Sequence, residues 1–166
     1  MDTAAHPSLA ASFRRPDTKN VFVASKECAW LVPLLLLLGY TGGLIAWKPV
    51  SDISEWLSVA PMLFFAPALG EELLFRWLIF ACPWPKTDAM KIALSTTLFI
   101  LWHPFQQCAF GPPWAQIFSD PWFLAMIAAL GFALARVFAS TRNIWLCVII
   151  HWAVVVSWKL IFGGPF

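Results

Sequence analysis

Charged residues are scarce in this sequence of 166 residues. Only 12% of the residues are charged, whereas a soluble domain usually carries about 25%. The scarcity of charge, together with a hydrophobic share of 60%, excludes an ordinary soluble domain. The 11 Trp and 15 Phe residues are typical of a surface that faces lipid and carries aromatic anchors at its interfaces. The composition therefore predicts an integral membrane protein of one domain.

Other features are also missing. The four cysteines form no CxxC pair, so neither a disulfide framework nor a thiolate metal site is expected. Outside the N-terminal arm there is no basic cluster of useful size, so nucleic acid is not expected as a partner. No internal repeat is visible, which argues against a secondary transporter built from repeats. The lipid bilayer is the partner that the composition predicts.

Five apolar stretches approach the length of about 20 residues that a membrane-spanning helix needs. They are residues 28–47, 56–82, 89–106, 121–139 and 143–162. Pro61 and Pro67 predict a kink in the second stretch. Between the third and fourth stretches, residues 106–120 are expected to form a proline-rich loop that could re-enter the membrane. We therefore expect an all-α, polytopic transmembrane bundle of about five helices over residues 27–166, after a cytoplasmic N-terminal arm over residues 1–26.

The basic residues predict which ends of these helices face the cytoplasm. With the N-terminus inside, eight basic residues fall on inner segments: Arg14, Arg15, Lys19, Lys26, Lys86, Lys91, Arg136 and Arg142. Only Lys48 and Lys159 fall on outer segments. This asymmetry follows the positive-inside rule and predicts an inner N-terminus and an outer C-terminus. The small size and the charge pattern indicate a multi-pass protein of a bacterial inner (plasma) membrane.

Five ionisable or imidazole side chains interrupt the apolar stretches: Glu71, Glu72, Arg76, His103 and His151. A charge at the middle of a bilayer costs at least ~2.5–3.5 kcal/mol. Glu72 and Arg76 lie four residues apart on one helix face and are expected to pair. Glu71 is rotated by about 100° from Glu72, so it is the carboxylate expected to remain available for chemistry.

Such a set of groups is typical of peptide hydrolysis. That reaction needs a base to activate water, a group that stabilises the oxyanion, and a proton donor for the leaving amine. Glu71 can act as the base, while a histidine N–H can stabilise the oxyanion or protonate the amine. Glutamate and histidine are also ordinary zinc ligands, so a divalent metal held by Glu71, His103 and His151 is an alternative. The HExxH spacing of common zinc hydrolases is absent.

Three short motifs occur in a fixed order along the chain. EExxxR lies at Glu71–Arg76, FxxxH at Phe99–His103, and the first residue of an HxxxN or HxxxD motif at His151. In these residues the chain resembles the CPBP family of intramembrane proteases, also known as the CAAX protease and bacteriocin-processing or Abi family. Each motif falls in a separate predicted helix, and the region that carries the resemblance runs from about residue 56 to residue 160.

The resemblance implies a helical bundle with its active site in a cavity within the bilayer. It implies that Glu71 is the general base, that His103 is an oxyanion donor, and that no cofactor is required. The older description of the family as metalloproteases implies a divalent metal instead. One position departs from the family pattern, because the last motif would place Asn or Asp where this chain has Val155. The N–H groups of Trp102 and Trp152 and the hydroxyl of Ser157 are candidate replacements.

The resulting hypothesis is an intramembrane endopeptidase that cuts a membrane-associated protein or peptide, for maturation or for removal of a C-terminal sorting signal. Two alternatives remain open. Val155 suggests a non-catalytic scaffold or bacteriocin immunity protein on the same frame. Carboxylates within the membrane, taken alone, suggest a small proton-coupled transporter.

Overall fold

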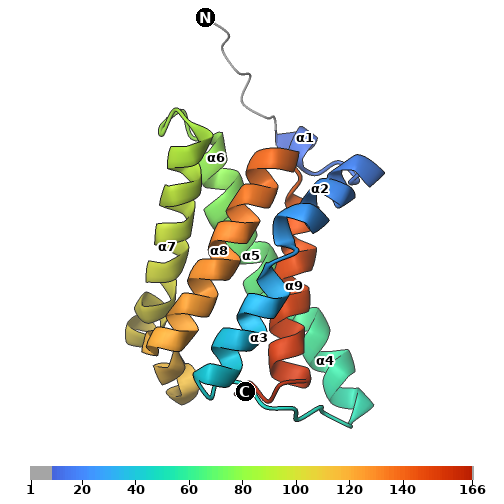
Figure 1. Ribbon diagram of the computed structural model, residues 1–166, viewed down its shortest axis with the longest axis vertical. Helices are drawn as coiled ribbons and strands as arrows, with labels where there is room; N and C mark the ends of the chain where they lie inside the picture. The colour runs from blue at the N-terminus through green and yellow to red at the C-terminus, as the bar shows by residue number, and fades with distance from the viewer. Residues whose placement is uncertain (1–8, 166) are drawn as a thin grey trace, which may run out of the picture.

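A computed structural model of the protein describes residues 9–165, and these residues are almost entirely helical (Figure 1). The elements are α1 (Leu9–Ser12), α2 (Thr18–Cys28), α3 (Leu31–Thr41), α4 (Ile53–Leu63), the π-helical segment η1 (Phe64–Leu69), α5 (Gly70–Glu72), the π-helical segment η2 (Leu73–Leu78), α6 (Ile79–Ala81), α7 (Asp88–Ala109), the 3-10 helix η3 (Pro113–Ser119), α8 (Pro121–Thr141) and α9 (Ile144–Leu160). The all-α prediction is confirmed.

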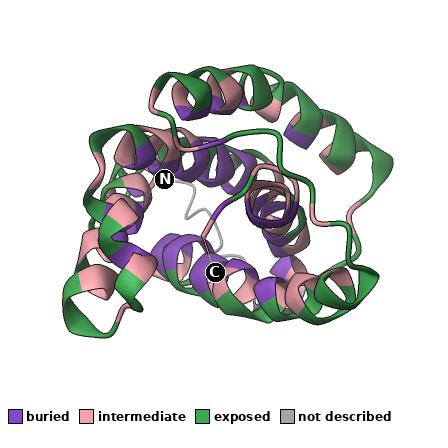
Figure 2. Ribbon diagram, turned by 90° about the horizontal axis from the view of Figure 1, so that it is seen from below, coloured by how far each residue is buried: buried purple, intermediate pink, exposed green. Residues whose placement is uncertain are grey.

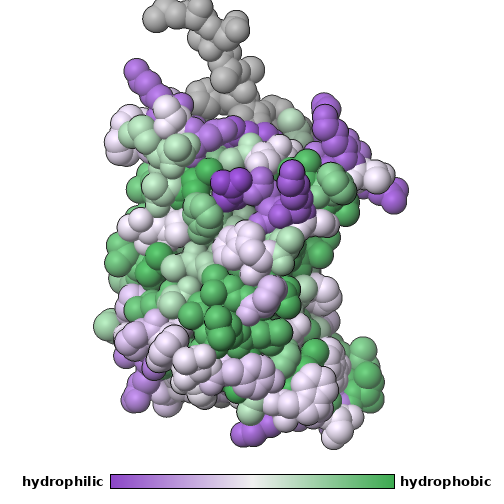
Figure 3. Space-filling view, in the orientation of Figure 1, coloured by the Kyte–Doolittle hydropathy of each residue, from purple (hydrophilic) through white to green (hydrophobic). Residues whose placement is uncertain are grey.

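Consecutive elements join into rods that alternate in direction: α2–α3, α4–α6, α7, α8 and α9. Segments expected on the same side of a membrane therefore lie at the same end of the bundle (Figure 1). Two ion pairs link these segments, Arg136 with Glu27 at 2.6 Å and Arg142 with Asp88 at 2.6 Å. Figure 3 shows hydrophilic side chains gathered towards the end of the bundle that carries these two ion pairs, at the top of the view. Apolar side chains are prominent over the middle of the visible face.

Within residues 9–165, three helices are long and apolar enough to cross a membrane: Thr18–Thr41, Ile53–Ala81 and Pro121–Thr141. Ile144–Leu160 is apolar but shorter, with 17 residues. The helix α7 has 22 residues, but charged and amide side chains near its ends reduce its apolar character. The second and fourth predicted stretches thus agree closely with the structure, while a total of five spans stays a prediction.

The first rod begins and ends earlier than the predicted stretch 28–47. It starts at Thr18 because the Asp17 carboxylate accepts a hydrogen bond from the Asn20 backbone N–H at 2.7 Å, which caps the helix. It ends at Thr41, and Gly43 then adopts a φ of 66°, which glycine tolerates without strain. Residues 18–26, expected in the N-terminal arm, are therefore helical, and residues 1–8 of that arm lie outside the described residues.

The second rod carries the kink that its prolines predicted. The helix is interrupted at Ala66, whose φ of −137° and ψ of 110° are those of extended backbone. Pro67 follows and cannot donate a backbone hydrogen bond. After the interruption the helix resumes through α5, which contains Glu71 and Glu72.

The core is centred on α8, which packs against α2, α3, α7 and α9. The inner faces of the helices are buried and the outer faces exposed when the bundle is viewed from below (Figure 2). Phe99 of α7 is fully buried and packs against Gly131 of α8. A Cβ atom at position 131 would lie 2.8 Å from Phe99 Cδ1, so glycine permits this close approach. The packing fixes the position of Phe99, which lies one helical turn before His103 on α7.

The connection predicted as a loop over residues 106–120 contains the helix η3. Pro113 is its first residue, a position where the fixed φ of proline suits a helical first turn. Ala115 and Phe118 are buried, and the Phe118 ring stacks on the Phe123 ring with centroids 5.4 Å apart. The segment thus packs against α7 and α8 at one end of the bundle.

Lys91 provides the first test of this fold. Its buried ammonium group donates to the carbonyl oxygens of Phe80 at 2.7 Å and Cys82 at 2.9 Å, and hydrogen bonds to charged groups contribute about 1.5–3 kcal/mol each. We expect Lys91→Met to lower the free energy of unfolding by about 2–4 kcal/mol, measured by denaturant titration in mixed micelles. The exposed Lys86→Met variant is the matched control, and equal stability of the two variants would contradict this role of Lys91.

Candidate active site

A buried ion pair forms the base of the site. Glu72 and Arg76 are fully buried, and Glu72 Oε2 lies 3.0 Å from Arg76 Nε, so the predicted pairing is present. Arg76 Nη1 also donates to Ser95 Oγ at 3.1 Å, and that hydroxyl donates to the Phe75 carbonyl at 2.8 Å. The guanidinium carbon lies 4.6 Å from the centroid of the Phe99 ring. The charge of Arg76 is therefore neutralised locally and connects the second rod to α7.

His151 of α9 is oriented by the same carboxylate. Its Nδ1–H donates to Glu72 Oε1 at 2.9 Å, because an ionised carboxylate can only accept. The other ring nitrogen, Nε2, lies 3.9 Å from Glu71 Oε2. Glu72 thus uses one oxygen for Arg76 and the other for His151, a connection over 79 residues that the sequence did not indicate.

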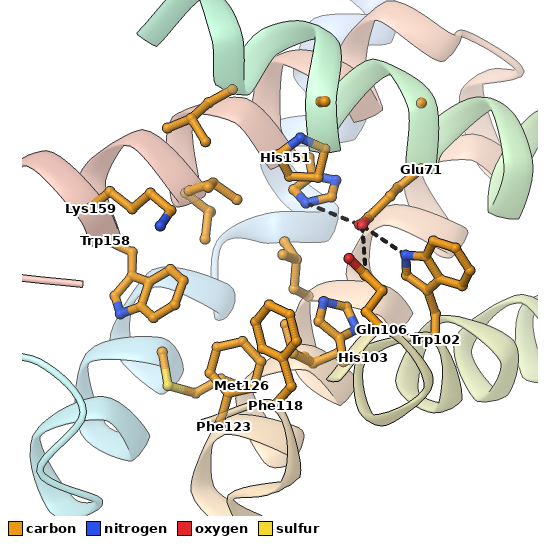
Figure 4. Close-up of a pocket in the computed structure, with 18 of the residues that line it drawn as sticks. Glu71, Trp102, His103, Gln106, Phe118, Phe123, Met126, His151, Trp158 and Lys159 are labelled. Carbon is orange, nitrogen blue, oxygen red and sulfur yellow. Dashed lines mark hydrogen bonds and ion pairs between the residues drawn. The ribbon is translucent and has the colours of Figure 1, made fainter. Parts of the chain in front are cut away.

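Glu71 differs from Glu72 in how its two oxygens are used (Figure 4). Its Oε1 atom accepts from Trp102 Nε1 at 2.9 Å and from Gln106 Nε2 at 3.4 Å. Its Oε2 atom is buried and has no hydrogen-bond partner among the described residues. The distance of 3.9 Å to His151 Nε2 is too long for a direct hydrogen bond, and a water that bridged the two atoms would lie beside the line that joins them.

His103 lines the same cavity from α7. Its Nδ1–H donates to the Phe99 carbonyl at 2.9 Å, because a carbonyl oxygen can only accept. Its ring packs against Phe118 and Phe123, with centroids 5.4 and 5.8 Å away. The Phe99 ring also makes an edge contact with each imidazole, at 5.1 Å from His103 and 5.7 Å from His151. The structure thus brings all five predicted residues to one region.

The cavity beside Glu71 has a volume of about 660 Å³ and is mostly apolar. Its lining comes from every rod and from η3, and includes the residues flanking the interruption at Ala66. In Figure 4, Glu71, Trp102 and Gln106 lie on one side of the cavity, and Trp158 and Lys159 on the other. A volume in the range of about 300–1,000 Å³ is typical of sites that bind small molecules and is enough for a short stretch of apolar peptide.

Val155 lines this cavity and offers it only carbon atoms. The three replacements considered from the sequence do not supply a spare donor there. Trp102 already donates its single N–H to Glu71. Trp152 donates to the Ala60 carbonyl at 2.7 Å, and Ser157 lines a second, apolar cavity between the first rod and α9. Gln106, which the sequence analysis did not single out, contacts Glu71 directly.

The arrangement of Glu71, His103 and His151 bears on a metal ion. Both imidazoles hold Nδ1 in a hydrogen bond and direct Nε2 elsewhere, as metal-bound histidines do. In the part of the chain that the structure describes, however, no three His, Cys, Asp or Glu side chains are grouped closely enough to hold a metal. These three residues therefore do not form a ready ligand set for a metal.

The buried ion pair generates the second prediction. Removing one partner of a buried pair leaves an uncompensated charge, at a cost of about 3–5 kcal/mol. We expect Arg76→Met to lower the free energy of unfolding in mixed micelles by about that amount, and Glu72→Met to do the same. The double variant Glu72→Met/Arg76→Met should lose clearly less than the sum of the two. Strict additivity would show that the two charges are not coupled.

Comparison with known proteins gives a match over the region of the chain that carries this site. A family model described as type II CAAX prenyl endopeptidase Rce1-like matches residues 53–157, which is more than half of the sequence and includes Glu71, Glu72, Arg76, His103 and His151. No curated protein and no solved structure matches. With its apolar helices, the chain is an integral membrane protein of the CAAX protease kind. It belongs to the type II CAAX prenyl endopeptidase Rce1-like family.

Proposed function

We propose that this protein cleaves membrane-associated proteins or peptides with a water molecule activated by Glu71, without a metal. The observation that carries the proposal is the asymmetry of the Glu71 carboxylate. Two side-chain donors hold Oε1, while Oε2 is buried, accepts no hydrogen bond from the described residues and lies 3.9 Å from His151 Nε2. One fixed oxygen orients the group, and the other is available to take a proton.

The reaction then needs few groups. A water between Glu71 Oε2 and His151 Nε2 gives its proton to Glu71 as its oxygen attacks the carbonyl carbon of the substrate. The electron pair of the carbonyl bond moves to its oxygen, which becomes the oxyanion. When that intermediate collapses, the C–N bond breaks and the leaving nitrogen takes the proton from Glu71. One water is consumed, and a carboxyl and an amino end are produced.

Glu72 and Arg76 act on this reaction through His151 and the local fold. The hydrogen bond from Nδ1 to Glu72 fixes the ring so that Nε2 faces Glu71. Arg76 balances the charge of Glu72, so that the carboxylate does not remain buried and uncompensated. They are positioning residues in this proposal.

The mostly apolar cavity suits a substrate segment that is itself apolar and stays partly within the membrane. Entry beside the interruption at Ala66 is consistent with the lining there, which includes Phe65 and Pro67. Processing of this kind would serve peptide maturation or removal of a C-terminal sorting signal, and the proposed location is a bacterial inner membrane.

The third prediction concerns Glu71. A glutamine there keeps the shape of the side chain but cannot take a proton, and general-base catalysis contributes about 10²–10⁴-fold. We expect Glu71→Gln, expressed to the wild-type level in the native host, to accumulate one or a few uncut precursors. Mass spectrometry of N- and C-termini in membrane and secreted fractions would identify them. Glu55→Gln, in the exposed first turn of α4, is the matched control.

Unchanged termini in the Glu71→Gln strain would contradict the proposal. If deleting the gene still produced a phenotype, a non-catalytic scaffold or immunity role would take its place. Proton flux in liposomes that disappears with Glu71→Gln would instead support a transporter.

The fourth prediction concerns the metal. Because the described residues form no grouped ligand set, we expect cleavage by the purified protein in liposomes to continue after incubation with EDTA or 1,10-phenanthroline. The rate should remain within about twofold of the untreated sample, a margin far below the 10²-fold or greater loss expected for a missing catalytic group. Loss of activity that added Zn²⁺ restores would overturn the metal-free mechanism.

A further inference from the structure

We propose that the side-chain amide of Gln106 donates a hydrogen bond to the oxyanion during cleavage. This inference rests on the proposed function, since it concerns the same site. Gln106 lies on α7, three residues after His103, and both residues line the cavity. No motif singles out Gln106, and its role follows from its contact with Glu71.

The negative oxygen that forms in the reaction needs an N–H or O–H donor close to Glu71. Val155 offers none, and the single indole N–H of Trp102 already donates to Glu71. Both imidazoles donate through Nδ1, so in the neutral form neither His151 nor His103, the oxyanion donor that the resemblance implied, carries an N–H at Nε2.

More distant groups in the cavity do not fill this role. Trp158 Nε1 is buried without a hydrogen-bond partner among the described residues. However, this nitrogen packs closely against Gly164, because a Cβ atom added to Gly164 would lie only 3.0 Å from it. Lys159 is two helical turns beyond His151 and donates to the Pro165 carbonyl. Both side chains lie across the cavity from Glu71 in Figure 4.

The amide of Gln106 is well placed and keeps a donor in reserve. An NH₂ group has two N–H bonds, and one of them makes a long contact of 3.4 Å with Glu71 Oε1. The other N–H bond makes no hydrogen bond to the described residues. Since the attacking oxygen and the oxyanion are bonded to the same carbon, an amide in contact with Glu71 lies within reach of both.

The test uses the full-length protein in liposomes and a synthetic peptide spanning the cleavage site of a precursor that accumulates with Glu71→Gln. Loss of one oxyanion donor lowers kcat by about 10²–10³-fold. We expect that loss for Gln106→Ala, with KM changed by less than about threefold, since the contact forms mainly in the transition state. Gln107→Ala is the matched control, because Gln107 accepts from Ser119 instead of contacting Glu71. It should keep the wild-type rate.

A second variant separates a donor from a structural role. Val155 faces the same cavity one helical turn after His151, so Val155→Asn introduces an amide there. Combined with Gln106→Ala, it should restore kcat at least tenfold. Thermal unfolding of each variant checks that the protein remains folded.

Three results would overturn the assignment. Wild-type kcat in Gln106→Ala, with Glu71→Gln inactive, would remove Gln106 from the reaction and leave the proposed function intact. A raised KM, or a loss of kcat that Val155→Asn does not restore, would make Gln106 a residue that holds substrate or Glu71. Cleavage that persists in Glu71→Gln would overturn the proposed function, and the role of Gln106 with it.

Discussion

The buried guanidinium of Arg76 is the constraint on which the rest of the site depends. A fully buried cation must be neutralised where it lies, because neither water nor lipid can do so. Glu72 supplies the negative charge from one turn earlier, and Ser95 of α7 accepts a hydrogen bond. Since Glu72 also accepts from His151 of α9, three rods are connected through one pair of charges. The arrangement of the proposed catalytic groups thus follows from the need to bury that pair without leaving a charge exposed to lipid.

Two neighbouring glutamates acquire different roles because a helix rotates by about 100° per residue. Glu72 faces Arg76 and His151, and both of its oxygens are used in holding the structure. Glu71 faces the cavity, and only one of its oxygens is held. The chemistry of the two side chains is the same, so the difference lies in which neighbours the rotation brings to each. A single-residue shift in helical register would move one glutamate into the surroundings of the other, and the interruption at Ala66 lies five residues before Glu71.

The parts of this site that the sequence could predict depend on local geometry. The Glu72–Arg76 pair follows from a spacing of four residues, and the kink follows from the chemistry of proline. The start of the first rod at Thr18 was missed, because its first turns are polar and depend on the Asp17 cap more than on hydrophobicity. The contacts of Gln106 and of His151 were also missed. They join residues 35 and 79 positions apart, and such contacts are set by how the rods pack.

The apolar character of the cavity would strengthen the few polar groups that the proposed hydrolysis uses. Next to an apolar lining, each hydrogen bond and each charge acts in a medium of lower dielectric constant than water, where its effect is larger than in solution. The same medium makes a missing donor more damaging, because no solvent replaces it. Val155 therefore places a greater demand on the groups next to Glu71. On the proposed mechanism, Val155 leaves the α9 wall without an amide at that position, and Gln106 on the α7 side is a side chain that already contacts Glu71.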